Sequence, residues 1–220
     1  MQPFPGKITR IEAQSKVRRH LGQRANVFID DKFSFALDVN LVLERGLRSG
    51  TVLSATDLNE LLRKDGDARA FARALHYLSY RPRSREEVRA RLKRDEWPDE
   101  VIVRVLARLE EKQLTNDSDF AAQWIDHRTL SSRPRGAYLL RQELRHKGVD
   151  RETIEAALPD ADAEIEHAVA AARPKLRQFP DLKDRAQRDK MIAFLQRRGF
   201  SFSTIKAALQ VLQDEESEES

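Results

Sequence analysis

The 220-residue chain contains no cysteine. A disulfide framework and a thiolate metal site are therefore excluded, which is compatible with a reducing cytoplasm. No apolar run approaches the ~20 residues that a membrane-spanning helix requires. The start, MQPFPGKITR, has no apolar core of signal-peptide length. The sequence therefore predicts a soluble, cytoplasmic protein with no membrane partner.

The chain also lacks recognisable catalytic motifs. It has neither a glycine-rich phosphate loop nor a GxSxG nucleophile elbow. The five histidines do not pair at a metal-ligand spacing such as i, i+4. These histidines are His20, His76, His127, His146 and His167. We therefore expect no enzymatic activity, no cofactor and no metal site.

What the sequence does contain is one apolar pattern that occurs three times with identical offsets. The copies are Val88, Leu92, Trp97, Ile102, Val105 and Leu106, then Leu140, Leu144, Val149, Ile154, Ala157 and Leu158, then Met191, Leu195, Phe200, Ile205, Ala208 and Leu209. The copies lie 52 and 51 residues apart. Such self-similarity is typical of stacked helical units with a continuous core. We expect Leu92, Leu144 and Leu195 to be buried and to link the units through apolar contacts.

Cap and turn residues divide each copy into helices. Ser54 with Asp57, and Ser84 with Glu87, have the spacing of helix N-caps. Asp150 follows Gly148 and is an N-cap candidate for a later helix. Trp97 fills the turn between two helices, and Trp124 lies on the apolar face of a helix. Both are interpreted as core residues.

The first 53 residues follow a different pattern. Residues 7–12 alternate with period two, and residues 25–29 and 33–37 flank a short polar turn, which favours a strand and a β-hairpin. We expect this segment to cap the end of a helical array. The expected organisation is a strand-bearing cap at 1–53, three-helix repeats at 54–114, 115–160 and 161–213, and an acidic disordered tail at 214–220.

Basic residues are concentrated around the second and third repeats, within a formal net charge of +4. An Arg-Pro-Arg element occurs at 81–83 and again at 133–135, each time before a helix. Cations near a helix N-terminus are mildly unfavourable, so their repetition suggests an anionic partner. A solvated helix surface is the alternative. The candidate partner-binding residues are Arg81, Arg83, Arg128, Arg133, Arg135, Arg141, Arg145 and Lys147.

Several short sequence segments resemble those of the RecX family, which are bacterial regulators of the RecA recombinase. In the first repeat these are Ala74-Leu75, Tyr77-Leu78, Arg83-Ser84, Glu87-Val88 and Leu92. In the second they are Leu114-Thr115-Asn116-Asp117, Phe120-Ala121, Arg128, Arg133, Gly136, Leu140, Glu143-Leu144, Lys147-Gly148-Val149 and residues 154–158. The third repeat matches mainly in Leu195, Gly199, Ile205 and Leu209. Glu96 departs from the pattern, because Gly148 and Gly199 stand at the equivalent turns.

The resemblance implies a mainly α fold of tandem three-helix repeats in an elongated, curved array. It implies a non-catalytic regulator that binds RecA in the helical groove of its DNA filament. Such a regulator restrains strand exchange, ATP hydrolysis and co-protease activity. Direct contact with single- or double-stranded DNA is also implied, and we expect a monomer. The alternative is a stand-alone DNA-binding helical-repeat protein that acts through phosphate contacts.

Overall fold

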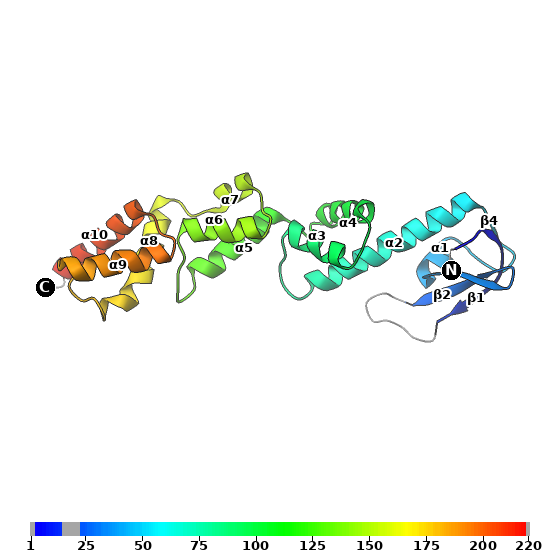
Figure 1. Ribbon diagram of the computed structural model, residues 1–220, viewed down its shortest axis with the longest axis horizontal. Helices are drawn as coiled ribbons and strands as arrows, with labels where there is room; N and C mark the ends of the chain where they lie inside the picture. The colour runs from blue at the N-terminus through cyan, green and yellow to red at the C-terminus, as the bar shows by residue number, and fades with distance from the viewer. Residues whose placement is uncertain (1–2, 15–22, 219–220) are drawn as a thin grey trace. The chain divides into compact units, whose positions relative to one another are not determined.

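The computed structural model describes residues 3–14 and 23–218 (Figure 1). These residues form a small antiparallel sheet and ten α-helices. The strands are β1 (Gly6–Ala13), β2 (Arg24–Ile29), β3 (Lys32–Asp38) and β4 (Val52–Leu53). The helices are α1 (Val39–Glu44), α2 (Ala55–Leu78), α3 (Arg85–Arg94), α4 (Asp99–Glu111), α5 (Asp117–Thr129), α6 (Ala137–His146), α7 (Arg151–Ala157), α8 (Ala161–Leu176), α9 (Arg185–Arg197) and α10 (Phe202–Glu218).

The chain divides into two compact units, which are described separately. Unit 1 consists of Met1–Arg83 with Val88–Leu114, and unit 2 consists of Ser84–Glu87 with Thr115–Ser220. Unit 1 thus holds the sheet and most of the first three-helix repeat. Unit 2 holds the second and third repeats. The mainly α fold with three helical repeats and an N-terminal strand-bearing cap is confirmed.

The sheet of unit 1 has the strand order β3-β2-β1-β4, and its neighbouring strands are antiparallel. Asp30 and Asp31 form the two-residue turn between β2 and β3, with φ angles of 48° and 61°. Two positive φ angles match the twist of the flanking strands, and aspartate tolerates them better than most residues. The predicted hairpin is therefore confirmed. Ile8, Val27 and Leu37 lie fully buried within the core of the cap.

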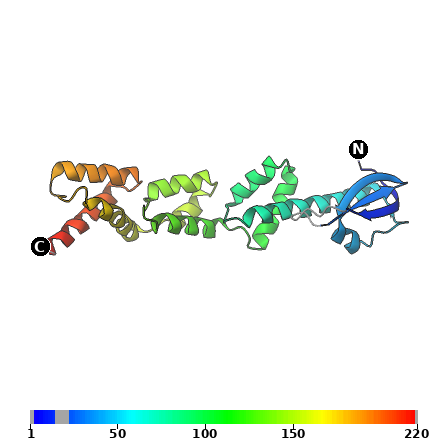
Figure 2. The ribbon, with the colours of Figure 1, turned by 90° about the horizontal axis from the view of Figure 1, so that it is seen from below.

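Helix α2 serves both the sheet and the first helical repeat. Its N-cap Ser54 forms a capping box with Asp57, as the sequence predicts. Leu58 and Leu61 belong to the core of the sheet, whereas residues 70–74 pack with α3 and α4 through Ala70, Phe71 and Ala74. The sheet accordingly lies beside the first part of this helix (Figure 2). One continuous helix therefore crosses from the cap into the repeat.

The three anchor leucines are buried as expected, each with 0% exposure. The expectation of a continuous core is wrong, because each leucine belongs to a separate apolar cluster. Leu92 lies in the α2–α4 cluster, Leu144 in the α5–α7 cluster and Leu195 in the α8–α10 cluster. Within unit 2, backbone hydrogen bonds join α6 to the turn after α9. Gly136 N donates to Arg198 O at 2.9 Å and Tyr138 N donates to Gly199 O at 3.2 Å.

The turn before the last helix of each repeat has the same left-handed conformation. Its central residue is Glu96, Gly148 or Gly199, with φ angles of 61°, 75° and 88°. The departure at Glu96 therefore leaves the turn geometry unchanged. Asp150 caps α7 by accepting from Thr153 N at 2.9 Å, which confirms its predicted role.

Helix α10 continues to Glu218, so residues 214–218 are helical where the sequence predicts a disordered tail. Asp214 accepts a hydrogen bond from Gln210 Nε2 at 2.8 Å, one turn earlier. Glu215 pairs with Arg173 of α8 at 2.8 Å. Residues 214–218 contain no glycine or proline that would interrupt the helix. The two contacts support its last turns. The last two residues of the predicted tail lie outside the described residues.

Candidate partner-binding surface

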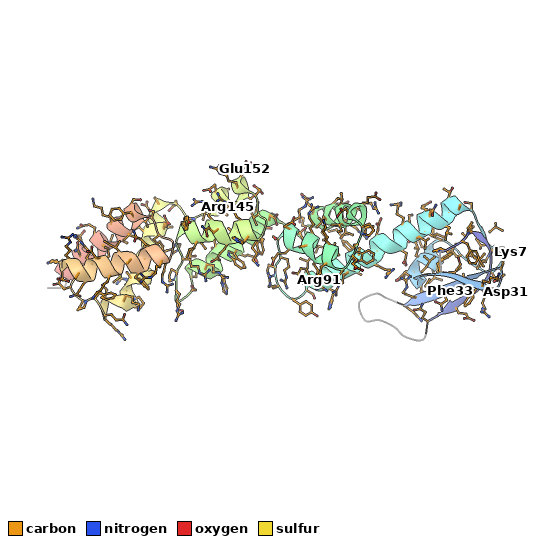
Figure 3. All side chains as sticks on the ribbon, in the orientation of Figure 1. Lys7, Asp31, Phe33, Arg91, Arg145 and Glu152 are labelled. Carbon is orange, nitrogen blue, oxygen red and sulfur yellow. The ribbon has the colours of Figure 1, made fainter. Side chains whose placement is uncertain are left out.

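Arg81 and Arg83 follow α2 in unit 1. The guanidinium of Arg83 lies 4.1 Å from the centre of the Tyr77 ring, and that of Arg91 lies 5.7 Å from the same ring. Arg91 is labelled on α3 in Figure 3. Arg81 is exposed and donates from Nη1 to Pro82 O at 2.9 Å. Stacking on tyrosine orients the Arg83 guanidinium.

In unit 2, Glu143 of α6 pairs with two of the candidate arginines. Its carboxylate accepts from Arg128 Nε at 3.1 Å and pairs with the guanidinium of Arg135. It also accepts from Trp124 Nε1 at 2.8 Å. The Arg128 guanidinium lies 4.4 Å above the Trp124 ring. Trp124 packs against the α5–α7 core with one face, as predicted, while its polar edge joins this charged cluster.

Two further predicted cations are held by carboxylates of the same unit. Arg141 makes a two-point contact with Glu155, at 2.7 and 2.9 Å. This contact raises the pKa of Arg141 and lowers the pKa of Glu155, because each hydrogen bond favours the charged form. Lys147 Nζ lies 3.0 Å from Glu87 Oε1. These ion pairs join neighbouring elements of unit 2 and partly neutralise both cations.

Arg133 and Arg145 differ from the rest of the predicted set. Both side chains are exposed, and neither guanidinium makes a hydrogen bond or ion pair with the residues that the structure describes. Arg145 lies on α6 (Figure 3). Arg133 lies in the loop before α6, where only its backbone N–H is bonded, to Ser131 Oγ at 3.2 Å. Of the predicted cations in unit 2, these two are the most available to a partner.

The sequence interpretation missed Arg197 and Arg198 at the end of α9. Together with Arg135, Leu139, Glu143 and Phe194, they line an open groove of about 420 Å³. Burial, followed by the charges of Arg133 and Arg135, lowers the pKa of Arg198. Burial and the charge of Arg128 likewise lower the pKa of Arg135. The equivalence of Lys147-Gly148 and Arg198-Gly199 in the repeat was a signal that could have identified Arg198.

Residues 3–14 and 23–218 contain no group of three or more His, Asp or Glu side chains placed to hold a metal ion. Within the same residues, no helix combines the length and apolar character that crossing a membrane requires.

Family models for RecX proteins match four successive segments of the chain. The model for the regulatory protein RecX N-terminal domain matches residues 6–54. Those for the RecX first, second and third three-helix domains match residues 70–109, 116–158 and 162–209. The matched segments follow the sheet and the three helical repeats in order.

Individual relatives give the same result. The chain is 34% identical to the regulatory protein RecX of Bacillus subtilis (strain 168), over 96% of this chain and 79% of that protein. It is also similar to a crystal structure of regulatory protein RecX, with a TM-score of 0.71 and 28% identity, covering 92% of this chain and 98% of that one. A crystal structure of RecX from Lactobacillus salivarius matches 68% of this chain and 98% of that one, with a TM-score of 0.62 and 26% identity.

Proposed function

This chain belongs to the RecX family of regulatory proteins, and we propose that it binds the RecA–DNA filament and inhibits its ATPase, strand-exchange and co-protease activities. The observation that carries the proposal is the ordered match of four RecX domains to the sheet and the three repeats. Exposed arginines on unit 2 support binding to a partner that carries negative charge.

The available cations suggest how binding would occur. Arg133 and Arg145 are exposed at two places on unit 2. A filament presents equivalent acidic or phosphate groups at regular intervals, so two separated contacts on one chain can be made together. The second contact then benefits from a high effective concentration, and avidity exceeds that of either contact alone. Arginine suits this role because its planar fork binds carboxylate or phosphate at two points.

The direct test is a RecA ATPase and strand-exchange assay on single-stranded DNA, with the purified chain added below the RecA concentration. We expect both activities to fall. Unchanged activity at an excess of the chain would contradict the proposal. DNA binding without any effect on RecA would instead favour the alternative of a stand-alone DNA-binding protein.

A second assay tests whether Arg133 and Arg145 contribute to the inhibition of RecA. The double variant Arg133→Ala/Arg145→Ala should inhibit less strongly, while its melting temperature stays within a few degrees of that of the parent chain, because surface substitutions contribute only about ±0.5 kcal/mol. A matched control is Arg188→Ala/Lys206→Ala, which removes the same charge from two other exposed positions of unit 2. Equal losses in both variants would indicate a general charge effect.

A further inference from the structure

In unit 2 the start of α6 lies beside the end of α9 (Figure 1), and backbone hydrogen bonds join the two. The groove lies at this junction. Arg135 reaches it from the loop before α6, and Arg197 and Arg198 reach it from the end of α9. Leu139 and Phe194 provide apolar walls. Three guanidinium groups from two distant parts of the sequence therefore share one open depression.

The groove is lined by more guanidinium groups than carboxylates. Glu143 is the one carboxylate among the described lining residues, and it already binds Arg128, Arg135 and the Trp124 N–H. Arg197 is exposed and its guanidinium has no hydrogen bond or ion pair within the described chain. The groove consequently holds a surplus of cations, which an anionic ligand would neutralise.

Arg198 shows the deficit most clearly. Its Nε atom is buried and has no hydrogen-bond partner among the described residues. Its Nη1 atom reaches only Pro134 O, at 3.4 Å, and its guanidinium lies 4.9 Å from the centre of the Phe194 ring. Stacking holds the group in place, but a backbone carbonyl is a poor substitute for a counter-charge.

The local electrostatics agree with this geometry. The pKa of Arg198 is lowered first by burial and then by the charges of Arg133 and Arg135. Such a cluster of like charges is costly in the empty chain, and an anion that binds there removes the repulsion. Arginine clusters of this kind are common where a protein recognises phosphate.

We propose that the groove lined by Arg135, Arg197 and Arg198 binds phosphate groups, carried either by a nucleic-acid strand or by a free nucleotide. Phosphate is favoured over carboxylate because its tetrahedral oxygens accept donors from several directions. The three guanidinium groups come from two separate segments, whereas a planar carboxylate suits one guanidinium edge, as Glu155 suits Arg141. This site is a property of unit 2 alone, and its test contains no RecA, so its failure is distinguishable from a failure of the proposed function.

The test measures binding of a fluorescein-labelled oligothymidylate of about 20 nucleotides to the full chain by anisotropy, across a range of salt concentrations. The test variant is Arg197→Ala, because this side chain lines the groove, is exposed and leaves the core intact when it is lost. Arg188→Ala is the control with equal charge, because Arg188 is exposed on the same helix, outside the groove lining. We expect affinity to fall about tenfold or more in the test variant, with a salt slope that is reduced by about 0.7 for each lost phosphate contact. The control should stay within about twofold of the parent.

Competition identifies the source and class of the ligand. ATP that displaces the oligonucleotide at micromolar concentration would support a site for a free nucleotide, whereas displacement only by unlabelled oligonucleotide would support a strand. Both outcomes agree with phosphate recognition. The proposal is overturned if polyglutamate of equal charge displaces the probe better than either phosphate ligand. It is also overturned if the test and control variants lose affinity equally, or if the parent chain does not bind the oligonucleotide at low salt.

Discussion

Gly148 lies directly against Glu86, such that a Cβ atom at Gly148 would come within 2.3 Å of the Glu86 Cβ. The same relationship recurs later in unit 2, where a Cβ at Gly199 would come within 2.7 Å of Leu139 Cγ. The equivalent turn of the first repeat contains Glu96, which is exposed. Two features therefore favour glycine at this turn. The backbone is left-handed, and the start of a neighbouring helix packs where a Cβ atom would lie.

This relationship predicts that Gly148→Ala destabilises the fold by about 2 kcal/mol or more, because it adds a steric overlap to an unfavourable positive φ. The matched variant is Glu96→Gly, which should be neutral or stabilising by up to ~1 kcal/mol, since glycine adopts the same φ without strain. Urea unfolding followed by circular dichroism measures both changes. Equal destabilisation by the two variants would refute the steric argument.

Leu144→Ala should lower the free energy of unfolding by roughly 2–5 kcal/mol, because Leu144 is fully buried and its loss leaves a cavity in the α5–α7 cluster. Leu130→Ala is the control, since Leu130 is 81% exposed in the same unit and should change stability by less than about 0.5 kcal/mol. Denaturant unfolding measures both. A cost below about 1 kcal/mol for Leu144→Ala would mean that the cluster does not hold unit 2 together.

Asp65 forms a largely buried ion pair with Arg24 in unit 1, and we expect its loss to destabilise the fold. Its side chain is 5% exposed and binds Arg24 at 3.0 and 3.1 Å and the Asp38 N–H at 2.9 Å. Asp65→Ala leaves a largely buried guanidinium without its carboxylate counter-charge, so we expect a loss of about 3–5 kcal/mol. The double variant Arg24→Met/Asp65→Leu removes both charges and should lose less. Thermal melting compares the two, and an equal or greater loss in the double variant would contradict the ion-pair explanation.

The Arg141–Glu155 pair predicts a specific response to acid. The hydrogen bond from Arg141 holds the pKa of Glu155 below its usual value of 4.5. A group whose folded pKa is depressed stabilises the fold above its unfolded pKa, and this contribution disappears as the pH falls through the folded pKa.

The melting temperature of Glu155→Gln should therefore fall less steeply than that of the parent chain between about pH 5 and pH 3. Near pH 7 the parent should be the more stable of the two. Melting curves across this range provide the measurement, with Glu152→Gln as an exposed control on the same helix. Parallel pH profiles for parent and Glu155→Gln would show that the pair contributes nothing.

The structure divides the candidate binding residues into exposed arginines and arginines paired with carboxylates, for a physical reason. Charge and spacing identify where arginines are concentrated, and Arg133 and Arg145 are indeed exposed. The same information does not tell an available arginine from a paired one. Arg141 and Arg145 are one helical turn apart, yet only Arg141 meets a carboxylate. That carboxylate belongs to α7, a separate helix, and its position depends on the packing of the repeat.

The sequence by itself determined the features that depend on neighbours along the chain. The period of the apolar residues gives the three repeats and their buried leucines. The caps at Ser54 and Asp150 follow from side chains that accept a hydrogen bond from the backbone N–H three residues later. Only the tertiary structure decided that each leucine lies in its own cluster, that Glu143 neutralises Arg128 and Arg135, and that Arg198 lies in a groove deficient in negative charge. These outcomes depend on long side chains that meet across separate helices, and periodicity along one chain carries no information about which of them will meet.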